Sequence, residues 1–326
     1  MTNPILVEVT RNLTVESLHR GAVAVVDGDG KTLFALGDVT SPAYTRSSLK
    51  PIQALPLVES GAADAFGLSE AELALACASH SGEMMHTAPV QAWLTRLGLS
   101  ESDLACGPQT PRYEPAAVAL AAAGERPCRL HNNCSGKHAG FLTLAKHLGV
   151  PTQGYQRLDH PVQQAVLAAV ERLSGETNLA WGIDGCAAPN FALPLTAFAR
   201  ALAQLAAGKT AGGMRLVKAM MAHPELVGGT GRFCTRAMQA MEGRAAVKVG
   251  AEGVYAAMLP GTGLGVAIKI DDGAVRGAEV AVAVVLEKLG VLAAEKGLAT
   301  HPILNTAGES VGEVRPSQEL RAITIG

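Results

Sequence analysis

The chain has 326 residues, of which 48% are apolar, 17% charged and 4% aromatic, and its formal net charge at pH 7 is -2. This length fits one large domain or two intertwined lobes around a substantial core. The charge provides no basic footprint for nucleic acid, and no apolar run is long enough to span a bilayer, so we expect neither nucleic-acid binding nor membrane insertion.

The N-terminal segment, Met-Thr-Asn-Pro followed by Leu6–Val9, lacks the basic-then-apolar layout of a signal peptide. The cysteines are widely scattered and form no C-x-x-C pair, which indicates free thiols or metal ligands rather than a disulfide framework. We therefore expect a cytoplasmic protein. The six cysteines are Cys77, Cys106, Cys128, Cys134, Cys186 and Cys234.

The first forty residues predict strands. Apolar and polar residues alternate over 6–10, and two further apolar runs, Ala22–Val26 and Lys31–Leu36, flank the segment Asp27-Gly28-Asp29-Gly30. Asp-Gly pairs tolerate the positive φ angles of tight hairpin turns. These residues therefore predict a β-hairpin.

The next segment, Arg46-Ser47-Ser48-Leu49-Lys50-Pro51, predicts the start of a helix that continues through Leu57. Proline is tolerated only in the first helical turn, so Ser47 lies at the helix N-terminus and Lys50 one turn along on the same face. A neutral lysine could then take the proton of the Ser47 hydroxyl and make it a nucleophile. An ordinary N-cap serine with a solvated lysine is the alternative interpretation, because S-x-x-K occurs often by chance.

Between roughly 51 and 242 the pattern is mostly Ala/Leu-rich and helical, as in Pro89–Leu97, Pro115–Ala123 and Gln163–Leu173. One interruption is rich in hydroxyl and imidazole groups, Cys77-Ala78-Ser79-His80-Ser81-Gly82-Glu83. Ser79 is a candidate second active-site hydroxyl that carries protons. The alternative is an N-cap that opens the next helix.

A second interruption, His131-Asn132-Asn133-Cys134-Ser135-Gly136-Lys137-His138, predicts a metal site. Cys134 and Lys137 are three residues apart and share a helical face, which His138 can share too, while Cys186 follows about fifty residues later. Two thiolates and one nitrogen donor would bind zinc and leave its fourth position open. Buried structural cysteines are the alternative.

Strand patterns return near the end of the chain. Gly253–Leu259 and Leu264–Ile270 flank Pro260-Gly261-Thr262-Gly263, an amphipathic helix is predicted over Ala278–Leu289, and a last strand over Val311–Pro316. Lys248-Val249-Gly250 enters this hairpin, and its glycine suits close approach of a substrate backbone, although an exposed strand lysine is the simpler interpretation.

The order of these elements predicts an α+β fold. We expect a mixed sheet formed from both termini, residues 1–46 and 243–326, with a helical lobe inserted over 47–242 of a single domain. An S-x-x-K that opens the helical lobe, with K-x-G on a late strand, is the arrangement of class A β-lactamases and penicillin-binding proteins.

Together these segments resemble the asparaginase family typified by the Rhizobium etli enzymes, over nearly the whole chain. The resemblance is carried by Arg46–Pro51, Ala78–Glu83, His131–Gly140 (HNNCSGKHAG), Asp159–Pro161, Trp181–Cys186, Gly231–Thr235 and Lys248–Val254 (KVGAEGV).

The resemblance implies a serine-β-lactamase-like fold, a homodimer, and hydrolysis of L-asparagine to L-aspartate and ammonia through a covalent acyl-enzyme. It places one Ser–Lys pair on Ser47 and Lys50 and a second on Ser79 and Lys248. It places the zinc ligands on Cys134, Lys137 and Cys186. The substrate is then expected to contact Arg46, Ser48, His80, Asp184 and Gly250, with Ser48 as the second choice for nucleophile.

Two positions depart from the pattern. Val249 stands where a threonine would complete K-T-G, and Gln109 stands where histidine is expected. Three other functions remain open: a glutaminase or β-lactam-recognising serine hydrolase on the same fold, an amidohydrolase that uses zinc-bound hydroxide, and a non-catalytic small-molecule binder.

Overall fold

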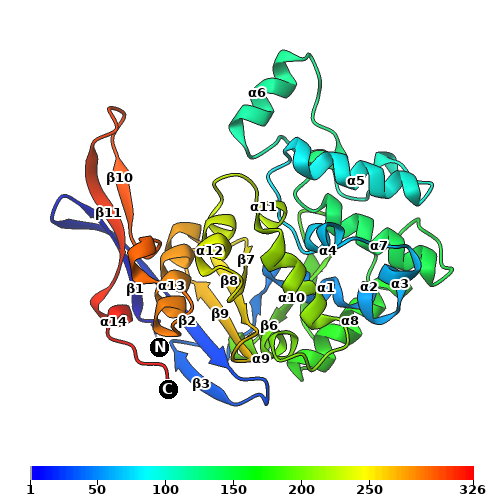
Figure 1. Ribbon diagram of the computed structural model, residues 1–326. Helices are drawn as coiled ribbons and strands as arrows, with labels where there is room; N and C mark the ends of the chain where they lie inside the picture. Colours follow the sequence, from blue (N-terminus) through cyan, green and yellow to red (C-terminus); the bar gives the residue numbers. More distant parts are fainter. Residues whose placement is uncertain (1) are drawn as a thin grey trace.

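The chain is described over residues 2–326 by a computed structural model, whose core is a sheet made from both ends of the chain (Figure 1). The order of its strands is β10-β11-β1-β2-β9-β8-β7, with β3 also paired to β2. The strands are β1 (Ile5–Arg11), β2 (Thr14–Val26), β3 (Thr32–Leu36), β7 (Ala246–Gly250), β8 (Val254–Leu259), β9 (Leu264–Ile270), β10 (His301–Leu304) and β11 (Ser310–Pro316).

Two strand pairs join the N-terminal and C-terminal parts of the sheet. β1 pairs with β11 and β2 with β9, so the expectation of one sheet formed from both termini is confirmed. The register places apolar residues opposite one another, as in Val23 with Ile268 and Val25 with Val266. The strand pairs of this sheet are all antiparallel, so the expected mixed sheet is antiparallel throughout residues 2–326.

Both predicted hairpin turns are present. β2 leads into β3 through a turn in which Gly30 has φ +89°, and β8 leads into β9 through a turn in which Gly263 has φ +69°. Side chains other than glycine rarely adopt such angles, which explains why Asp-Gly and Thr-Gly stand at these places.

The segment between β3 and β7 is largely helical, as expected. The predicted helices correspond to α5, α6 and α8, and the late helix to α13. The helices are α1 (Lys50–Gln53), α2 (Leu55–Glu59), α3 (Ala62–Ala65), α4 (Glu70–Ala76), α5 (Met84–Arg96), α6 (Glu114–Ala122), α7 (Ser135–His147), α8 (Pro161–Ser174), α9 (Leu195–Ala206), α10 (Gly213–Ala222), α11 (Pro224–Val227), α12 (Phe233–Met241), α13 (Val275–Lys288) and α14 (Gln318–Arg321), with 3-10 turns η1 (Arg46–Leu49), η2 (Glu101–Asp103), η3 (Arg129–His131) and η4 (Ala294–Lys296).

The inserted segment is not helical throughout. β4 (Ala43–Tyr44), β5 (Trp181–Ile183) and β6 (Pro189–Leu193) form a second, three-stranded sheet that the sequence patterns did not predict. In addition, α9 lies against β9 and β2 of the main sheet rather than among the other helices alone. The exact division of the chain into a sheet lobe and a helical lobe therefore stays a prediction.

The helix expected to run from Ser47 to Leu57 is broken. Residues 46–49 form the 3-10 turn η1, and α1 and α2 follow as two short pieces separated at Ala54. Pro56 explains the break, because it has no N–H to donate to Ile52 and its ring would clash with that carbonyl in a continuous helix.

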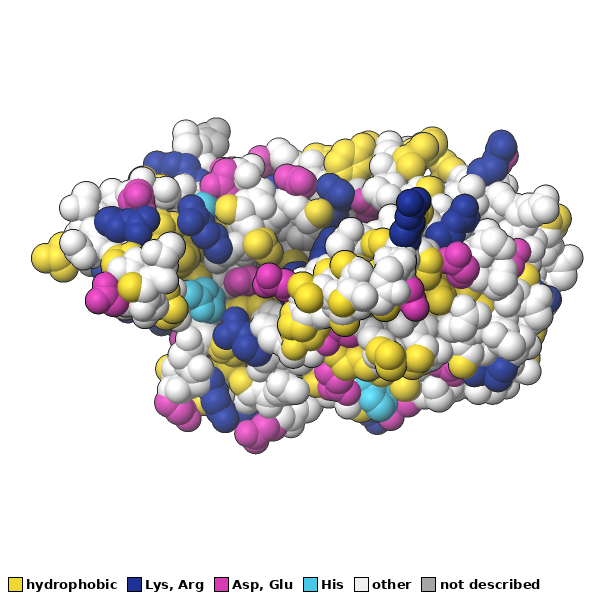
Figure 2. Space-filling view, turned by 90° about the horizontal axis from the view of Figure 1, so that it is seen from above, with side chains coloured by type: hydrophobic (Ala, Val, Ile, Leu, Met, Phe, Trp, Pro, Cys, Tyr) yellow, Lys and Arg dark blue, Asp and Glu magenta, His cyan; other side chains and the backbone are white. Residues whose placement is uncertain are grey.

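Charged side chains of both signs are distributed over the face in Figure 2. Lys and Arg side chains are interspersed there with Asp and Glu, without a continuous basic stripe. Over residues 2–326, no helix is both long and apolar enough to cross a membrane.

One close approach fixes the inserted segment on the sheet. Gly265 of β9 lies directly under α9, where a Cβ atom would fall well inside van der Waals contact of the Ala199 carbonyl oxygen and the Ala203 nitrogen. Both are backbone atoms, so they cannot turn away as a side chain can. The helix can pack at this depth only because residue 265 has no side chain.

We therefore expect Gly265→Ala to lower the free energy of unfolding by about 1–3 kcal/mol, because overpacking forces the helix away from the sheet. Urea denaturation followed by circular dichroism measures this change. Gly261→Ala in the same hairpin is the matched control, since nothing lies within 4 Å of its added Cβ. Equal stability of the two variants would contradict the close approach.

Candidate active site

Two fully buried lysines converge on the hydroxyl of Ser79. Lys248 Nζ lies 2.7 Å from Ser79 Oγ, and Lys50 Nζ lies 2.9 Å from the same oxygen. The exposed fraction is 0% for both lysines and 4% for Ser79. The structure thus brings together three of the four residues that the sequence predicted as catalytic, although Ser79 and Lys248 are 169 residues apart in the chain.

Three elements hold these groups. Lys50 is the first residue of α1, Lys248 lies in the edge strand β7, and Ser79 follows the end of α4. The Ser79 backbone N–H donates to the Val227 carbonyl, which fixes the segment after α4 against α11. Burial of a lysine costs free energy unless its N–H donors have acceptors. The packing of these three elements provides those acceptors.

The hydrogen bonds of the two lysines differ. Lys50 Nζ has three oxygen acceptors, the carbonyls of Ala78 and Asn133 and the Ser79 hydroxyl, which match the three N–H donors of an ammonium group. Lys248 Nζ contacts only Ser79 Oγ and its neighbouring Val249 carbonyl. This geometry suits a charged Lys50 beside a neutral Lys248.

The electrostatics agree with that assignment. Burial, and next the positive charge of Lys50, lower the pKa of Lys248 from its usual 10.5 to about 7. Burial also lowers the pKa of Lys50, whereas the nearby Cys134 thiol opposes that shift. Near neutral pH, Lys248 is therefore able to accept a proton.

Ser47 lies in the wall of a small pocket beside this cluster. The pocket has a volume of about 220 Å³, and Ser47 is half-buried, with no hydrogen-bond partner for its hydroxyl among residues 2–326. The predicted hydrogen bond between Ser47 and Lys50 is not formed in this structure. The pocket is lined by Ser47, Ser79, Arg112, Asn133, Arg232, Val249, Gly250, Ala251, Glu252 and Val275.

Ser48 and Gly250 shape the same wall. Ser48 is fully buried and its hydroxyl donates to the Thr45 carbonyl, so it faces away from the pocket that Ser47 lines. A Cβ at Gly250 would lie 2.8 Å from the Thr45 oxygen and 3.2 Å from the Ser48 nitrogen. Glycine is therefore required for β7 to approach η1, which gives the predicted Gly250 a packing role next to Ser47.

An ion pair links the Ser47 turn to the segment that carries Cys186. Arg46 Nη2 lies 2.9 Å from Asp184 Oδ1, and the Arg46 backbone N–H donates to Asn190 Oδ1. Arg46 has φ +50°, an angle that costs a non-glycine residue free energy and that these two contacts maintain. Arg46 and Asp184 hence hold the turn in place, and neither lines the pocket.

The three predicted metal ligands form one buried cluster. Lys137 Nζ lies 3.1 Å from Cys186 Sγ, and Cys134 stands at the N-cap of α7, one turn before Lys137. α7 reaches this place because Gly136 packs directly on the Leu75 carbonyl of α4, where any Cβ would clash. Over residues 2–326, no group of three His, Cys, Asp or Glu side chains suits a metal ion, so a third protein ligand here would have to be the lysine.

The donor chemistry of this cluster fits zinc. The Cys134 thiol beside it, and next the charge of Lys137, lower the pKa of Cys186 to about 4, whereas the pKa of Cys134 is raised to about 12. Burial alone would lower the pKa of Lys137, but the Cys186 and Cys134 sulfurs raise it. Without metal the cluster is therefore a thiolate–ammonium pair beside a thiol, and binding of zinc would release protons from Cys134 and Lys137.

His80 and His138 both make hydrogen bonds outside the pocket. His138 Nδ1 lies 2.6 Å from the Tyr155 hydroxyl, so that nitrogen is engaged outside the cysteine cluster. His80 is fully buried, accepts the Gly82 N–H on Nδ1, and places Nε2 2.9 Å from Ser135 Oγ. His80 does not line the pocket, so its expected contact with substrate has no direct route here.

Gln109, where histidine was expected, supports the lysine cluster. Its Oε1 accepts hydrogen bonds from the Asn133 backbone N–H at 3.1 Å and from Asn133 Nδ2 at 2.7 Å. The Asn133 carbonyl then accepts from Lys50. The amide of Gln109 thus fixes a residue that stands between the lysines and Cys134.

The sequence patterns missed the charged residues of the pocket. Arg232 and Glu252 lie inside Gly231–Thr235 and Lys248–Val254, two segments that were singled out without a role for these side chains, and Arg112 lies in a loop with no recognisable motif. No local signal points to Arg112, because its place in the pocket depends on how the 111–113 loop meets the Ser79 segment.

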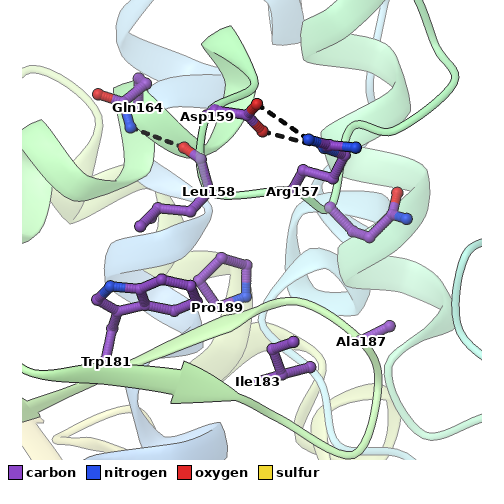
Figure 3. A pocket seen from close by; sticks show the side chains of 9 residues that line it. Arg157, Leu158, Asp159, Gln164, Trp181, Ile183, Ala187 and Pro189 are labelled. Atoms are coloured by element: carbon purple, nitrogen blue, oxygen red, sulfur yellow. Dashed lines mark hydrogen bonds and ion pairs between the residues drawn. The ribbon is translucent and has the colours of Figure 1, made fainter.

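A larger cavity, of about 640 Å³, lies elsewhere (Figure 3). Trp181, Ile183 and Pro189 of the small sheet form one wall, and the 156–159 loop with its Arg157–Asp159 ion pair forms the opposite wall. Its lining contains no hydroxyl, thiol, lysine or histidine. It therefore lacks the serine and lysine side chains that an acyl-serine mechanism requires.

Comparison with known protein families identifies one that matches nearly the whole chain. The profile of the family described as L-asparaginase II matches residues 7–316. No curated protein matches the chain significantly.

Among solved structures, similarity is found to Mglu in its native form (14% identity, TM-score 0.46, 79% of this chain and 61% of that chain). It is also found to a putative β-lactamase from Bacteroides dorei (15%, 0.40, 77% and 84%) and to a mutant class C β-lactamase (14%, 0.40, 79% and 89%). The chain thus spans about six-tenths of the length of Mglu, and at these identities and TM-scores none of the three bears on its substrate.

Proposed function

The chain belongs to the L-asparaginase II family and is an amidohydrolase, and on this premise we propose that it hydrolyses L-asparagine to L-aspartate and ammonia through an acyl-serine intermediate. The observation that carries the proposal is the Ser79 hydroxyl between two buried lysines, at the floor of a small pocket that also contains Ser47. A volume of about 220 Å³ is below the usual range for drug-sized ligands, which suits a small amino acid.

In the proposed mechanism Ser47 attacks the side-chain amide carbon of asparagine. Ser47 is the more accessible of the two pocket hydroxyls and follows a strained turn, as a nucleophile that must reach substrate often does. Its proton passes through the Ser79 hydroxyl to Lys248, whose pKa of about 7 makes it a base at neutral pH. This replaces the expectation that Lys50 is the base, since three acceptors favour the charged form of Lys50.

The protonated Lys248 next returns its proton through Ser79 to the leaving ammonia, and water then cleaves the aspartyl ester by the same relay in reverse. The positive charge of Lys50 stabilises the negative charge that develops near Ser79. Backbone N–H groups of η1 and of the Lys248–Gly250 strand are the proposed donors to the oxyanion, because Gly250 brings these two segments together.

Ser79 itself is the second candidate for nucleophile. It is the hydroxyl with a formed serine–lysine hydrogen bond, whereas Ser47 has none. Catalytic hydrogen bonds often tighten only when substrate binds, so the site of acylation distinguishes the two serines.

We further propose that Cys134, Lys137 and Cys186 bind zinc. The metal would supply a positive charge that holds the β5–β6 turn, and the Arg46–Asp184 ion pair carries that constraint to the Ser47 turn. A cytoplasmic location and a homodimer complete the proposal. The first is supported by six free cysteines and the second by the family resemblance, and light scattering of the purified protein tests the dimer.

The nucleophile is tested by trapping the acyl-enzyme. We expect the wild-type protein to release ammonia from L-asparagine, and acid quenching followed by peptide mass spectrometry to find an aspartyl ester on Ser47. Ser47→Ala is expected to lower kcat by about 10⁴-fold or more and to abolish the ester. An ester on Ser79 would transfer the role to that residue, and near-normal turnover by Ser47→Ala would favour zinc-bound hydroxide. Ammonia release from glutamine and acylation by a β-lactam, measured side by side, test the other substrates.

The base is tested by the pH dependence of kcat/KM. Because only neutral Lys248 accepts a proton, the rate is expected to fall about tenfold for each pH unit below 7 and to level off above about pH 8. Measurement between pH 5.5 and 9.5 in a buffer that keeps the protein folded is sufficient. A rate independent of pH over that range would rule out a lysine base with the pKa assigned here.

Metal content is tested by elemental analysis of protein dialysed against zinc and then against metal-free buffer. We expect about one zinc ion per chain in the wild type and none in the Cys134→Ala, Cys186→Ala double variant. Cys128→Ala, which removes a partly exposed thiol outside the cluster, should keep its zinc. Equal zinc in all three proteins, or none in the wild type, would contradict the site.

A further inference from the structure

The pocket of Ser47 carries three charged groups that have no partner. Arg112, Arg232 and Glu252 all line it, yet none forms an ion pair within 4 Å with another or with any residue in 2–326. The side chains of the two arginines also make no hydrogen bond within that part of the chain. Other arginines of the protein do pair with carboxylates, as Arg46 does with Asp184.

We propose that Arg112 and Arg232 together bind the α-carboxylate of the substrate, and that Glu252 binds its α-ammonium group. The inference rests on the proposed function, and it assigns the residues that select a free amino acid for the Ser47–Ser79 site.

The chemistry of the two arginines fits a carboxylate. Guanidinium groups donate paired N–H bonds in the geometry that a carboxylate accepts, and they stay charged at all working pH values. Both arginines line the same pocket, and partial removal from water, followed by the positive charge of Arg232, lowers the pKa of Arg112. A carboxylate between them would relieve their repulsion.

The same short segment positions both arginines and the relay serine. The Ser81 carbonyl accepts the backbone N–H of Arg112 at 2.8 Å, and Ser81 Oγ donates to the Gly228 carbonyl at 3.1 Å. The Glu83 carboxylate accepts the backbone N–H of Thr230 at 2.9 Å and its hydroxyl at 2.6 Å, two residues before Arg232. Residues 79–83 thus set the arginines at a fixed distance from Ser79.

Gly229 shows how tightly this connection is built. It has φ +113°, and a Cβ there would lie 2.7 Å from Glu83 Oε1. The loop that leads to Arg232 can pack on Glu83 only with glycine at this place. The close packing of this loop on Glu83 therefore limits where the backbone of Arg232 can lie.

Glu252 lines the pocket from a different element, the turn that follows β7. It has φ +58°, an unusual angle for a residue with a side chain, in the turn between β7 and β8 just after Gly250. Its backbone carbonyl accepts from Lys269 Nζ at 2.8 Å, which anchors the turn without engaging the carboxylate. Backbone strain at a pocket residue is a reason to expect a function for its side chain.

In this arrangement the arginines and Glu252 select the substrate by the charges of its α-carboxylate and α-ammonium groups. Asparagine inside a peptide has neither the α-carboxylate nor the α-ammonium, so it would leave three charges unpaired in the pocket. Sites built to pair with polar groups reject ligands that lack them far more strongly than apolar pockets reject a missing methylene. We therefore expect the free amino acid to be the substrate.

Three small amides test each contact separately. L-Asparagine has both groups, succinamic acid lacks the α-amino group, and 3-aminopropanamide lacks the α-carboxyl group. We expect Arg112→Gln and Arg232→Gln each to raise KM for asparagine and for succinamic acid by on the order of 10–100-fold, with no comparable change for 3-aminopropanamide. We expect Glu252→Gln to raise KM for asparagine and for 3-aminopropanamide, but not for succinamic acid.

Arg236→Gln is the matched control, because this exposed arginine lies one turn further along α12 and outside the pocket. Loss of activity that is equal for all three amides in the arginine variants would overturn the assignment. Unchanged KM values for asparagine would overturn it as well.

Binding separates this inference from the proposed function. Calorimetry with L-aspartate needs no turnover, and we expect wild-type binding that is lost in the Arg112→Gln, Arg232→Gln double variant and kept in Arg236→Gln. A protein that binds aspartate through these arginines but releases no ammonia from any amide would refute the proposed hydrolysis alone. A protein that hydrolyses asparagine while the double variant binds aspartate normally would refute the carboxylate site alone.

Discussion

Two lysine side chains share a single buried hydroxyl, and the surrounding structure is arranged to make this arrangement stable. Within residues 2–326, neither lysine has a carboxylate hydrogen-bonded to it that would offset the loss of water. Three carbonyl oxygens and one serine hydroxyl take the place of water, and they come from the segment after α4, from the residue before the N-cap of α7 and from β7. Because these elements are distant in the chain, their close packing is a condition for any chemistry at Ser79.

Glycine makes that packing possible. Gly136 lets α7 rest on α4, Gly250 lets β7 reach η1, and Gly265 lets α9 lie on β9. Each brings two backbones closer than any side chain would allow. The cysteine cluster depends on the first of these contacts and the pocket of Ser47 on the second, so the two sites are parts of one packed unit.

The sequence predicted most elements of the fold because their signals are local. The Asp-Gly and Thr-Gly hairpins and the helices with regular apolar spacing were correct, whereas β5, only three residues long, and the break at Pro56 gave weaker local signals. The paired motifs located Ser79, Lys50, Lys248 and the cysteine cluster. Motifs did not identify Lys248 as the neutral lysine, since that follows from the hydrogen-bond acceptors around each lysine in space, nor Arg112, whose place depends on long-range packing.

The sheet made from both ends of the chain has a consequence for synthesis in the cell. Glu8 of β1 pairs with Arg315 of β11, 307 residues later, and Lys248 reaches Ser79 only once β7 has joined the same sheet. During translation the strands β1 and β2 therefore leave the ribosome long before their partners exist. Such long-range pairing slows folding and exposes unpaired strand edges, so the nascent chain depends on protection from aggregation until its last strands emerge.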